Sequence, residues 1–308
     1  MSTIRSLLDR VGETINRWRF KHSLRQILLT RQIATGEEPF TALSMVHHRD
    51  VDAYLLAIKS FCLYFNPRRI VVVADPSITD EDRARIASHV EGIDFVRAED
   101  YRESVLPQGG CWERLIAISE YVKDDYVIQL DADTVTLQHM PEVRDAVLNS
   151  RSFVLATEDG QDFVSSSEAS HWAKPRVASG EHVQVLAEAN LDRLFGSDSI
   201  RYVRGCAGFS GFAPGSFNRE HLRELSGAMG AILADKWSSW GTEQFASNYM
   251  VSNSPKACVL PHPKYCHPGR ERPGTVFLHF IGYVRFSTGR YARAATETSV
   301  ALGGPAKP

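Results

Sequence analysis

The sequence has few cysteines and no motif that pairs them. Its five cysteines, in 308 residues, include no Cys-x-x-Cys pair. A sparse, odd set of this kind predicts no disulfide framework and is typical of a reducing compartment. No apolar run approaches the roughly 18 residues needed to span a bilayer, and residues 1–32 lack the apolar core and cleavage site of a signal peptide. We therefore expect a cytoplasmic protein.

Charge of one sign is not in excess either. The 35 Lys and Arg residues against 37 Asp and Glu residues give a net charge of −2 at pH 7. A protein that coats nucleic acid needs a strong basic excess to release counterions from phosphates, so we expect no nucleic-acid partner. With 43% hydrophobic and 23% charged residues, the chain has the composition of a globular protein with a large core.

Positive charge is concentrated at the start of the chain. Residues 1–32 contain seven Lys and Arg residues but only two Asp and Glu residues. Apolar residues recur there at the three- and four-residue spacing of a helical stripe, at Ile4, Leu7, Leu8, Val11, Ile15 and Trp18. The pattern predicts a basic amphipathic helix, or two helices broken near Phe20. Its stripe either lies in an anionic membrane surface or packs on the rest of the protein or on a second subunit.

Alternating strand and helix patterns follow from Thr41 onward, which is typical of a parallel α/β sheet. The predicted strands are Ala42–His47, Ile70–Ala74, Ile93–Val96 and Tyr126–Leu130. The predicted helices are Val51–Phe65, Asp80–Val90 and Trp112–Tyr121. The last segment, Ser287–Pro308, is rich in Ala, Gly, Thr and Pro, and we expect it to fray as a flexible tail.

Two carboxylates follow the apolar strand Tyr126–Leu130. Asp131 and Asp133 are two residues apart, so in an extended segment both side chains can point toward one cation. Ligands of open α/β sheets bind beyond the carboxyl ends of the strands. Carboxylate oxygens favour Mg²⁺ or Mn²⁺, commonly shared with a diphosphate. The pattern predicts a metal site, although the two aspartates could instead form a turn or cap a helix.

Four further segments combine polar side chains with small or apolar residues, and each could contribute to the same ligand site. They are the helix that contains Arg114, the small-residue run Gly205–Phe212, the helix start Trp240–Asn248, and the strand end His279–Arg285. Each also has an ordinary structural interpretation, such as a surface arginine or a bulged core strand. Their order along the chain is more informative than any one of them.

In that order, the segments resemble the motifs of glycosyltransferase family 8, the retaining, metal-dependent nucleotide-sugar transferases of the GT-A fold. The similar segments are Arg114-Leu115, Gln129–Thr134, Cys206–Phe209, Glu243–Asn248 and His279–Phe286. The resemblance covers roughly Ala42–Phe286. It implies an α/β, GT-A-like (Rossmann-like) mixed sheet flanked by helices, after the basic amphipathic helix. Together with the basic first segment and the composition of the last one, it predicts a division into an N-terminal helical segment (residues 1–35), a GT-A-like domain (36–286) and a flexible tail (287–308).

The resemblance implies roles for the residues at the motif positions. A Mn²⁺ or Mg²⁺ ion would be held by Asp131, Asp133 and His279. The donor would be bound by Arg114, Ala132, Ala207, Gly208, Gly282 and Asp75. The catalytic residues would be Gln244, Glu243 and Arg285. The expected reaction transfers a sugar with retention from a nucleotide diphosphate donor, by resemblance a UDP-sugar, to a hydroxyl of a glycan or lipid-linked acceptor in surface polysaccharide or lipopolysaccharide synthesis.

Three departures from the family pattern leave other functions open. Cys206 replaces an amide, Glu243 replaces an aspartate and Arg285 replaces a lysine. A non-catalytic sugar-nucleotide or glycan-binding module on the same fold is one alternative. An inverting GT-A transferase with Glu243 as base is another. Haloacid-dehalogenase-type phosphatases also use Asp-x-Asp, but on the first strand of their fold.

A second metal site is conceivable from side-chain types alone. Thiols and imidazoles of the kind that bind zinc occur together at Cys258, His262, Cys266 and His267. The segment has no paired cysteine spacing, and two prolines suggest an irregular loop. We therefore favour ordinary buried cysteines there.

Overall fold

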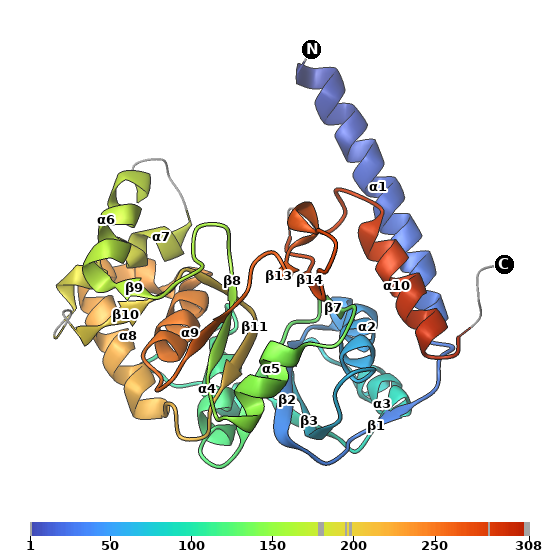
Figure 1. Ribbon diagram of the computed structural model, residues 1–308, viewed down its shortest axis with the longest axis horizontal. Coiled ribbons are helices and arrows are strands. Elements are labelled where there is room, and N and C mark those ends of the chain that lie inside the picture. Colours follow the sequence, from blue (N-terminus) through green and yellow to red (C-terminus); the bar gives the residue numbers. More distant parts are fainter. Residues whose placement is uncertain (1, 178–181, 195, 197–198, 283, 305–308) are drawn as a thin grey trace.

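The computed structural model describes residues 2–177, 182–194, 196, 199–282 and 284–304, with side chains from residue 10 onward (Figure 1). The helices are α1 (Ser2–Ile27), α2 (Val51–Phe61), α3 (Asp80–His89), α4 (Trp112–Tyr121), α5 (Pro141–Leu148), α6 (Ser166–Val177), α7 (Val183–Glu188), α8 (Arg219–Leu233), α9 (Thr242–Ser252) and α10 (Arg290–Ala301). The strands are β1 (Ile33–Ala34), β2 (Glu38–Val46), β3 (Pro67–Ala74), β4 (Val90–Glu91), β5 (Ile93–Arg97), β6 (Tyr126–Leu130), β7 (Thr134–Thr136), β8 (Phe153–Ala156), β9 (Val164–Ser165), β10 (Arg201–Tyr202), β11 (Gly205–Phe212), β12 (Cys258–Leu260), β13 (Tyr265–Cys266) and β14 (Phe277–His279).

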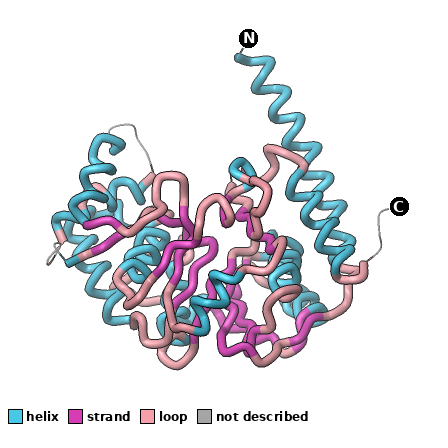
Figure 2. Tube along the Cα trace, viewed as in Figure 1, coloured by secondary structure: helices cyan, strands magenta, loops and turns pink. Residues whose placement is uncertain are grey.

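A seven-stranded sheet forms the centre of the molecule (Figure 2). Its strand order is β12-β8-β11-β6-β2-β3-β5, and all neighbouring strands are parallel except that β11 runs antiparallel to both β8 and β6. The predicted α/β class with a mixed sheet is therefore confirmed. A small three-stranded sheet, β13-β14-β7, brings β14 antiparallel to β7, the strand that follows Asp133.

The sheet has a hydrophobic core on each face, because side chains alternate along its strands. In β3, Ile70 and Val72 join the core on one face, whereas Val71 and Val73 join the core on the other. Helices α2, α5 and α10 contribute to the first core, and α4, α8 and α9 to the second. The carboxyl ends of β2 and β6 therefore lie between two helical layers.

The local signals in the sequence predict several elements closely. β6 and α4 have the predicted bounds, and α3 begins at Asp80 with a capping box in which Thr79 and Asp82 exchange side-chain to backbone hydrogen bonds. α2 ends four residues early, at Phe61. The chain turns there, and the ring of Phe65 stacks on the ring of Phe61 with their centroids 4.7 Å apart.

Helix α1 is unbroken from Ser2 to Ile27, so the alternative of two helices broken near Phe20 is wrong. Its inward face packs on α10, and Phe20 stacks on Tyr291 with centroids 3.7 Å apart. Phe20, Leu24 and Ile27 are buried. No helix of the described residues is long and apolar enough to cross a membrane.

The prediction that the chain frays from Ser287 onward is wrong, because most of this segment forms helix α10. The helix covers Arg290–Ala301, and its Tyr291, Ala294 and Ala295 are buried. The small residues that suggested a tail let α10 lie close to α1, and Thr296 donates a hydrogen bond to Ser23 of that helix (3.2 Å). Residues 305–308 lie outside the described part of the chain. The proposed division into residues 1–35, 36–286 and 287–308 otherwise stays a prediction.

Candidate active site

Three predicted metal ligands converge at the carboxyl end of β6. One oxygen of each carboxylate of Asp131 and Asp133 and one ring nitrogen of His279 lie within 4.8 Å of one another. We call these three residues the metal cluster. Backbone bonds fix the segment, because the N–H of Asp131 donates to the carbonyl of Gly208 (2.9 Å) and the N–H of Phe280 donates to the carbonyl of Asp133 (2.8 Å). Among the described side chains, this is the one cluster with metal-ligand geometry.

The imidazole of His279 is held from both ends. Its Nε2 lies 3.0 Å from Asp133 Oδ1, and its Nδ1 lies 3.3 Å from the Sγ of Cys206. Gly208 lies against the ring, so that any side chain at this position would collide with the imidazole. Gly208 therefore lets the histidine approach the carboxylates closely.

Two arginines pair with the same carboxylates. Arg114, from α4, contacts Asp131 and also lies 3.1 Å from Oε1 of Glu243 at the start of α9. Arg285, from the segment after β14, contacts Asp133 and lies 3.4 Å from Oδ1 of Asp50. Arg114 is almost fully buried, and its Nε has no hydrogen-bond partner. The arrangement brings Arg114 and Arg285 to the metal cluster, with Glu243 beside Arg114.

The charges of these groups shift one another's pKa values. Burial tends to raise the pKa of Asp133, but His279 and Arg285 lower it to about 2. Burial tends to lower the pKa of His279, but Cys206 and Asp133 raise it. Burial raises the pKa of Glu243 to about 7 even though Arg114 opposes the shift. Asp133 is therefore ionised at neutral pH, as a metal ligand must be.

The ligand set suits a divalent cation such as Mn²⁺ or Mg²⁺. Carboxylate oxygens are the ligands that these ions prefer, and imidazole binds metals in its neutral form. A bound cation would replace the ring proton of His279 that Asp133 otherwise stabilises. Cys206 would then act on the far nitrogen of the ring, the position from which a hydrogen-bond partner orients a ligating histidine.

Gln244 has a supporting group of residues that sequence reasoning missed. Its amide donates to Gln184 of α7, and Gln184 donates to Oε1 of Glu188 (2.9 Å). Tyr202 donates to the same oxygen (3.0 Å), and Arg204 pairs with Oε2. We call Gln184, Glu188, Tyr202 and Arg204 the Glu188 cluster. No local motif marks these residues, because they come from α7 and from the β10–β11 segment.

Burial sets the protonation of the Glu188 cluster. Glu188 is buried, which raises its pKa to about 7 although Arg204, Tyr202 and Gln184 favour the ionised form. Because all of these partners are donors, each carboxylate oxygen has a hydrogen bond. Within the cluster Gln184 donates a hydrogen bond to Glu188, and it accepts one from Gln244, so the cluster fixes the side chain of Gln244.

The remaining predicted donor-binding residues are distributed unevenly. Ala207 and Gly208 lie in β11 beside the cluster, and the carbonyl of Ala207 accepts a bond from Gln129 of β6. Ala132 lies between the two aspartates and is half-buried. Gly282 is exposed, with open space where a Cβ would be. Asp75 follows β3, two strands away from β6, where its carboxylate accepts from the N–H of Ser77 (2.9 Å) and faces His47.

The conceivable zinc cluster does not assemble among the described residues. His267 lies 3.2 Å from Glu158, and Cys258 and Cys266 lie in β12 and β13 with free thiols. The phosphatase alternative is also disfavoured, because the Asp-x-Asp strand is β6 and not the first strand of the sheet.

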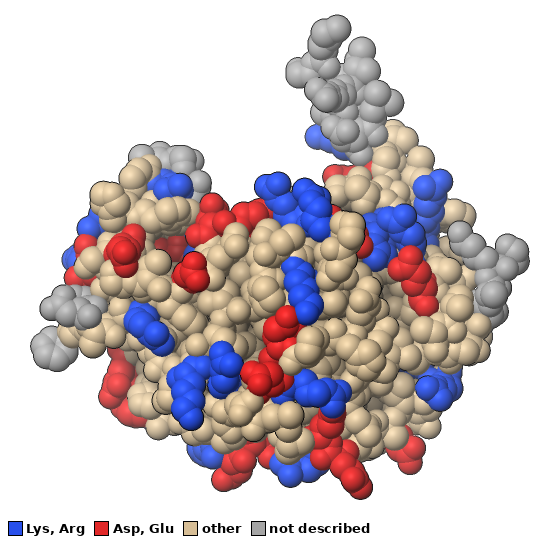
Figure 3. All heavy atoms as spheres, viewed as in Figure 1, with Lys and Arg blue, Asp and Glu red and all other residues tan. Residues whose placement is uncertain are grey.

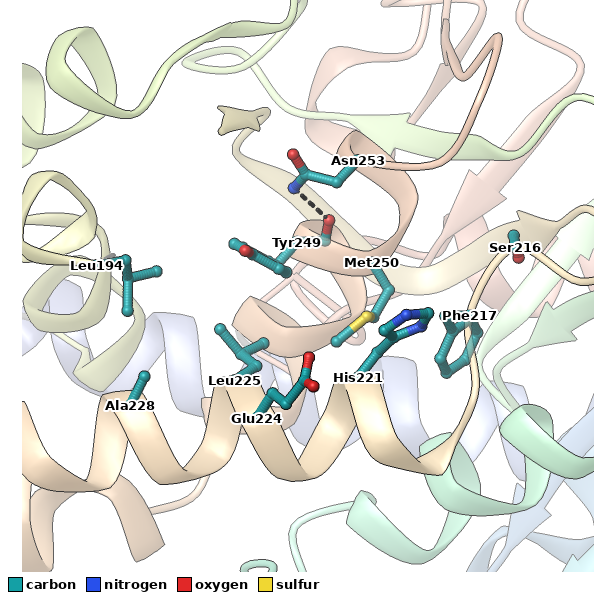
Figure 4. Close-up of a pocket in the computed structure, with 10 residues that line it drawn as sticks. All are labelled: Leu194, Ser216, Phe217, His221, Glu224, Leu225, Ala228, Tyr249, Met250 and Asn253. Carbon is teal, nitrogen blue, oxygen red and sulfur yellow. Dashed lines mark hydrogen bonds between the residues drawn. The ribbon is translucent and has the colours of Figure 1, made fainter. Parts of the chain in front are cut away.

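A separate cavity of about 450 Å³ lies between α8 and α9 (Figure 4). Its walls include Leu225, His221 and Glu224 of α8 and Met250 and Tyr249 of α9. None of the predicted site residues lines it.

Several solved glycosyltransferase structures resemble this structure over most of its length. A galactosyltransferase, LgtC, in complex with donor and acceptor sugar analogs, matches with a TM-score of 0.49 and 14% identity, over 87% of this chain and 98% of LgtC. The glycosyltransferase GlyE of Streptococcus pneumoniae matches with a TM-score of 0.46 and 14% identity, over 88% and 66% of the two chains. Mouse xyloside xylosyltransferase 1 matches with a TM-score of 0.42 and 11% identity, over 74% and 86%.

No protein-family profile and no curated protein matches the sequence. At such low identities and TM-scores, the structural matches do not assign the chain to a family.

Proposed function

We propose that the protein is a metal-dependent glycosyltransferase that uses a nucleotide diphosphate sugar. The observation that carries the proposal is the convergence of Asp131, Asp133 and His279 at one strand end, with Arg114 and Arg285 paired to the two aspartates. Breaking the bond between a sugar and a diphosphate builds negative charge on the leaving group. A divalent cation beside arginines suits that chemistry.

A Mn²⁺ or Mg²⁺ ion held by the metal cluster would neutralise charge on the departing diphosphate. Arg285 would add a second positive charge, and its Nε is fixed by the carbonyl of Phe280 (3.2 Å). Arg114 and Glu243 would hold each other in place and bind sugar hydroxyls. Gln244 would lie near the anomeric carbon, where the Glu188 cluster limits its movement. An amide is a poor nucleophile, so the acceptor hydroxyl would attack on the face that the leaving group vacates, and its proton would pass to the departing diphosphate oxygen.

The finer parts of the proposal come from the motif resemblance. They are a UDP-sugar donor, retention of configuration, and a role in surface polysaccharide or lipopolysaccharide synthesis. A glycan or lipid-linked acceptor suits that role, and residues 1–32 would carry any contact with a membrane. Ala132, Ala207, Gly208, Gly282 and Asp75 are the proposed donor-binding residues besides Arg114.

Donor hydrolysis tests the proposal. We expect the protein to release nucleoside diphosphate and free sugar from one of a panel of nucleotide sugars when Mn²⁺ is present, and to stop when the metal is chelated. Asp133→Asn should be inactive under the same conditions. A protein that binds a nucleotide sugar but never turns it over would instead be the non-catalytic binding module.

An inverting transferase is the second candidate. It is favoured by the position of Glu243, which is buried 3.1 Å from Arg114 beside the metal cluster. Burial raises the pKa of Glu243 to about 7, and a carboxylate base works best when its pKa is near the working pH. NMR of the first-formed glycoside separates the two. An α-linked product from an α-linked donor supports retention, whereas a β-linked product supports Glu243 as the base.

A further inference from the structure

Helix α1 has two apolar faces, and the part of the chain that the structure describes covers only one of them. Phe20, Leu24 and Ile27 point inward and are buried. Val11, Ile15 and Trp18 follow the i, i+4, i+7 spacing of the opposite face, and their exposed fractions are 51%, 46% and 67%. Figure 1 shows this part of α1 extending away from the body of the molecule. The predicted alternative that these three residues pack on the rest of the chain is therefore wrong.

Basic side chains flank the exposed apolar face. Residues 10–27 contain five Lys and Arg residues and a single acidic residue, Glu13. Helical spacing places Arg19 on one side of the Val11–Ile15–Trp18 face and Lys21 on the other, and both side chains are exposed. Figure 3 shows Lys and Arg side chains gathered where α1 leaves the body. The rest of the chain is net acidic.

The inward side of α1 contacts the segment that contains Arg285. Asn16 donates a hydrogen bond to the carbonyl of Phe286 (3.0 Å), and the guanidinium of Arg17 lies 4.6 Å from the centroid of the Phe286 ring. Phe20 stacks on Tyr291, which in turn stacks on Phe280, the residue after His279 (centroids 4.0 Å apart). The helix therefore has a fixed position relative to the metal cluster.

We propose that the outer face of α1 docks on an anionic lipid membrane. An apolar strip of Val, Ile and Trp flanked by Lys and Arg has the chemistry of a helix that lies in the lipid interface, with the strip among acyl chains and the cations at the headgroups. Tryptophan is favoured at that depth. The proposal does not depend on the reaction proposed above.

Two other occupants suit this face less well. A second copy of the chain would bring two basic helices together, and their like charges would repel. Nucleic acid would use the arginines but would leave the apolar strip in water. The experiment includes the second copy as one of its outcomes.

Vesicle co-sedimentation of the full-length protein tests the proposal. The probes are vesicles of phosphatidylcholine alone and vesicles that contain phosphatidylglycerol. We expect binding to the anionic vesicles and at least tenfold weaker binding to the neutral ones. Ile15→Glu places a charge in the strip and should weaken binding by about tenfold or more. Leu148→Glu is the matched control, because Leu148 is 70% exposed on α5, and it should bind like the wild type.

The charge requirement is tested separately by Arg19→Glu combined with Lys21→Glu. This variant should lose binding to anionic vesicles in low salt, while its circular dichroism spectrum and thermal midpoint stay unchanged. Ile15→Glu should also keep any turnover of a soluble donor, since Ile15 lies on the face away from the metal cluster. That result separates failure of docking from failure of the proposed reaction.

Three results would overturn the proposal. They are equal sedimentation of wild type and Ile15→Glu, no sedimentation of the wild type with anionic vesicles, and a wild-type dimer that Ile15→Glu converts to a monomer without any vesicle binding.

Discussion

The metal cluster and the Glu188 cluster each contain a buried carboxylate paired with an arginine, yet the pKa values of the carboxylates shift in opposite directions. The pKa of Asp133 falls to about 2, because the effects of His279 and Arg285 outweigh the effect of burial. The pKa of Glu188 rises to about 7, because the effect of burial outweighs that of Arg204. At the metal cluster, one possible ligand atom from each of three residues lies within 4.8 Å of the other two. At the Glu188 cluster, donors saturate a single carboxylate. Ligand atoms that lie close together suit a bound cation. A single carboxylate that accepts several hydrogen bonds suits a structural support.

The largest expected effect comes from removing a metal ligand. Asp131→Asn, Asp133→Asn and His279→Ala should each reduce metal-dependent turnover on the order of 10² or more, because each removes a ligand where leaving-group charge develops. Initial rates with saturating Mn²⁺ measure the effect. Circular dichroism should show that the fold is kept. Near-normal rates for any one of the three would mean that this residue is not a ligand.

A smaller effect is expected when the histidine is displaced without being removed. Gly208→Ala places a methyl group against the His279 ring, and we expect metal affinity to fall by about 10- to 100-fold. Mn²⁺ titration by electron paramagnetic resonance measures the affinity. Gly227→Ala, on α8 where a Cβ meets nothing within 4 Å, is the matched control and should leave affinity unchanged. Equal affinities for the two variants would contradict the role assigned to the Gly208–His279 contact.

The metal cluster shows which parts of a site the sequence predicts well and which it does not. The aspartates and β6 were predictable because an apolar strand with two carboxylates at its end is a local pattern, and the bounds Tyr126–Leu130 are those of the structure. His279 required the order of distant motifs, since it lies 146 residues from Asp133. The contribution of Asp50 to Arg285 was missed, because that pairing joins positions 235 residues apart.

The Glu188 cluster could not be predicted in the same way. Gln184 and Glu188 are an ordinary helical pair at i and i+4, and nothing local indicates that Gln244 contacts them from α9. Helix α10 was missed for a different reason. Its alanines suggest a fraying tail when the chain is read alone, and only the neighbouring helix α1 makes that composition useful.

The smallest effect on turnover is expected at the Glu188 cluster, which is tested instead by the pH dependence of the free energy of unfolding. A folded-state pKa raised from 4.5 to about 7 means that stability from Glu188 is complete below about pH 4.5 and is lost as pH rises through about 7. Glu188→Gln cannot ionise, so it should not show this loss. The free energy of unfolding of the wild type, relative to the variant, should therefore fall by up to about 3 kcal/mol across this range.

Urea denaturation at pH 5 and pH 8 measures that difference. Turnover of Glu188→Gln should stay within about tenfold of the wild type, far above that of Asp133→Asn, because Glu188 acts only through Gln184 and Gln244. A loss as large as that of Asp133→Asn would place Glu188 among the reacting groups. A stability difference that does not change with pH would contradict its raised pKa.

The central claim is that the metal cluster binds a divalent cation together with a nucleoside diphosphate, and thermal unfolding tests it most directly. A ligand that binds only the folded state raises the unfolding midpoint in proportion to its affinity and concentration. With a panel of nucleoside diphosphates, we expect one of them and Mn²⁺ together to raise the midpoint of the wild type by more than the sum of their separate effects. Asp133→Asn should lose that excess. No excess with any diphosphate, or the same excess in the variant, would contradict the claim.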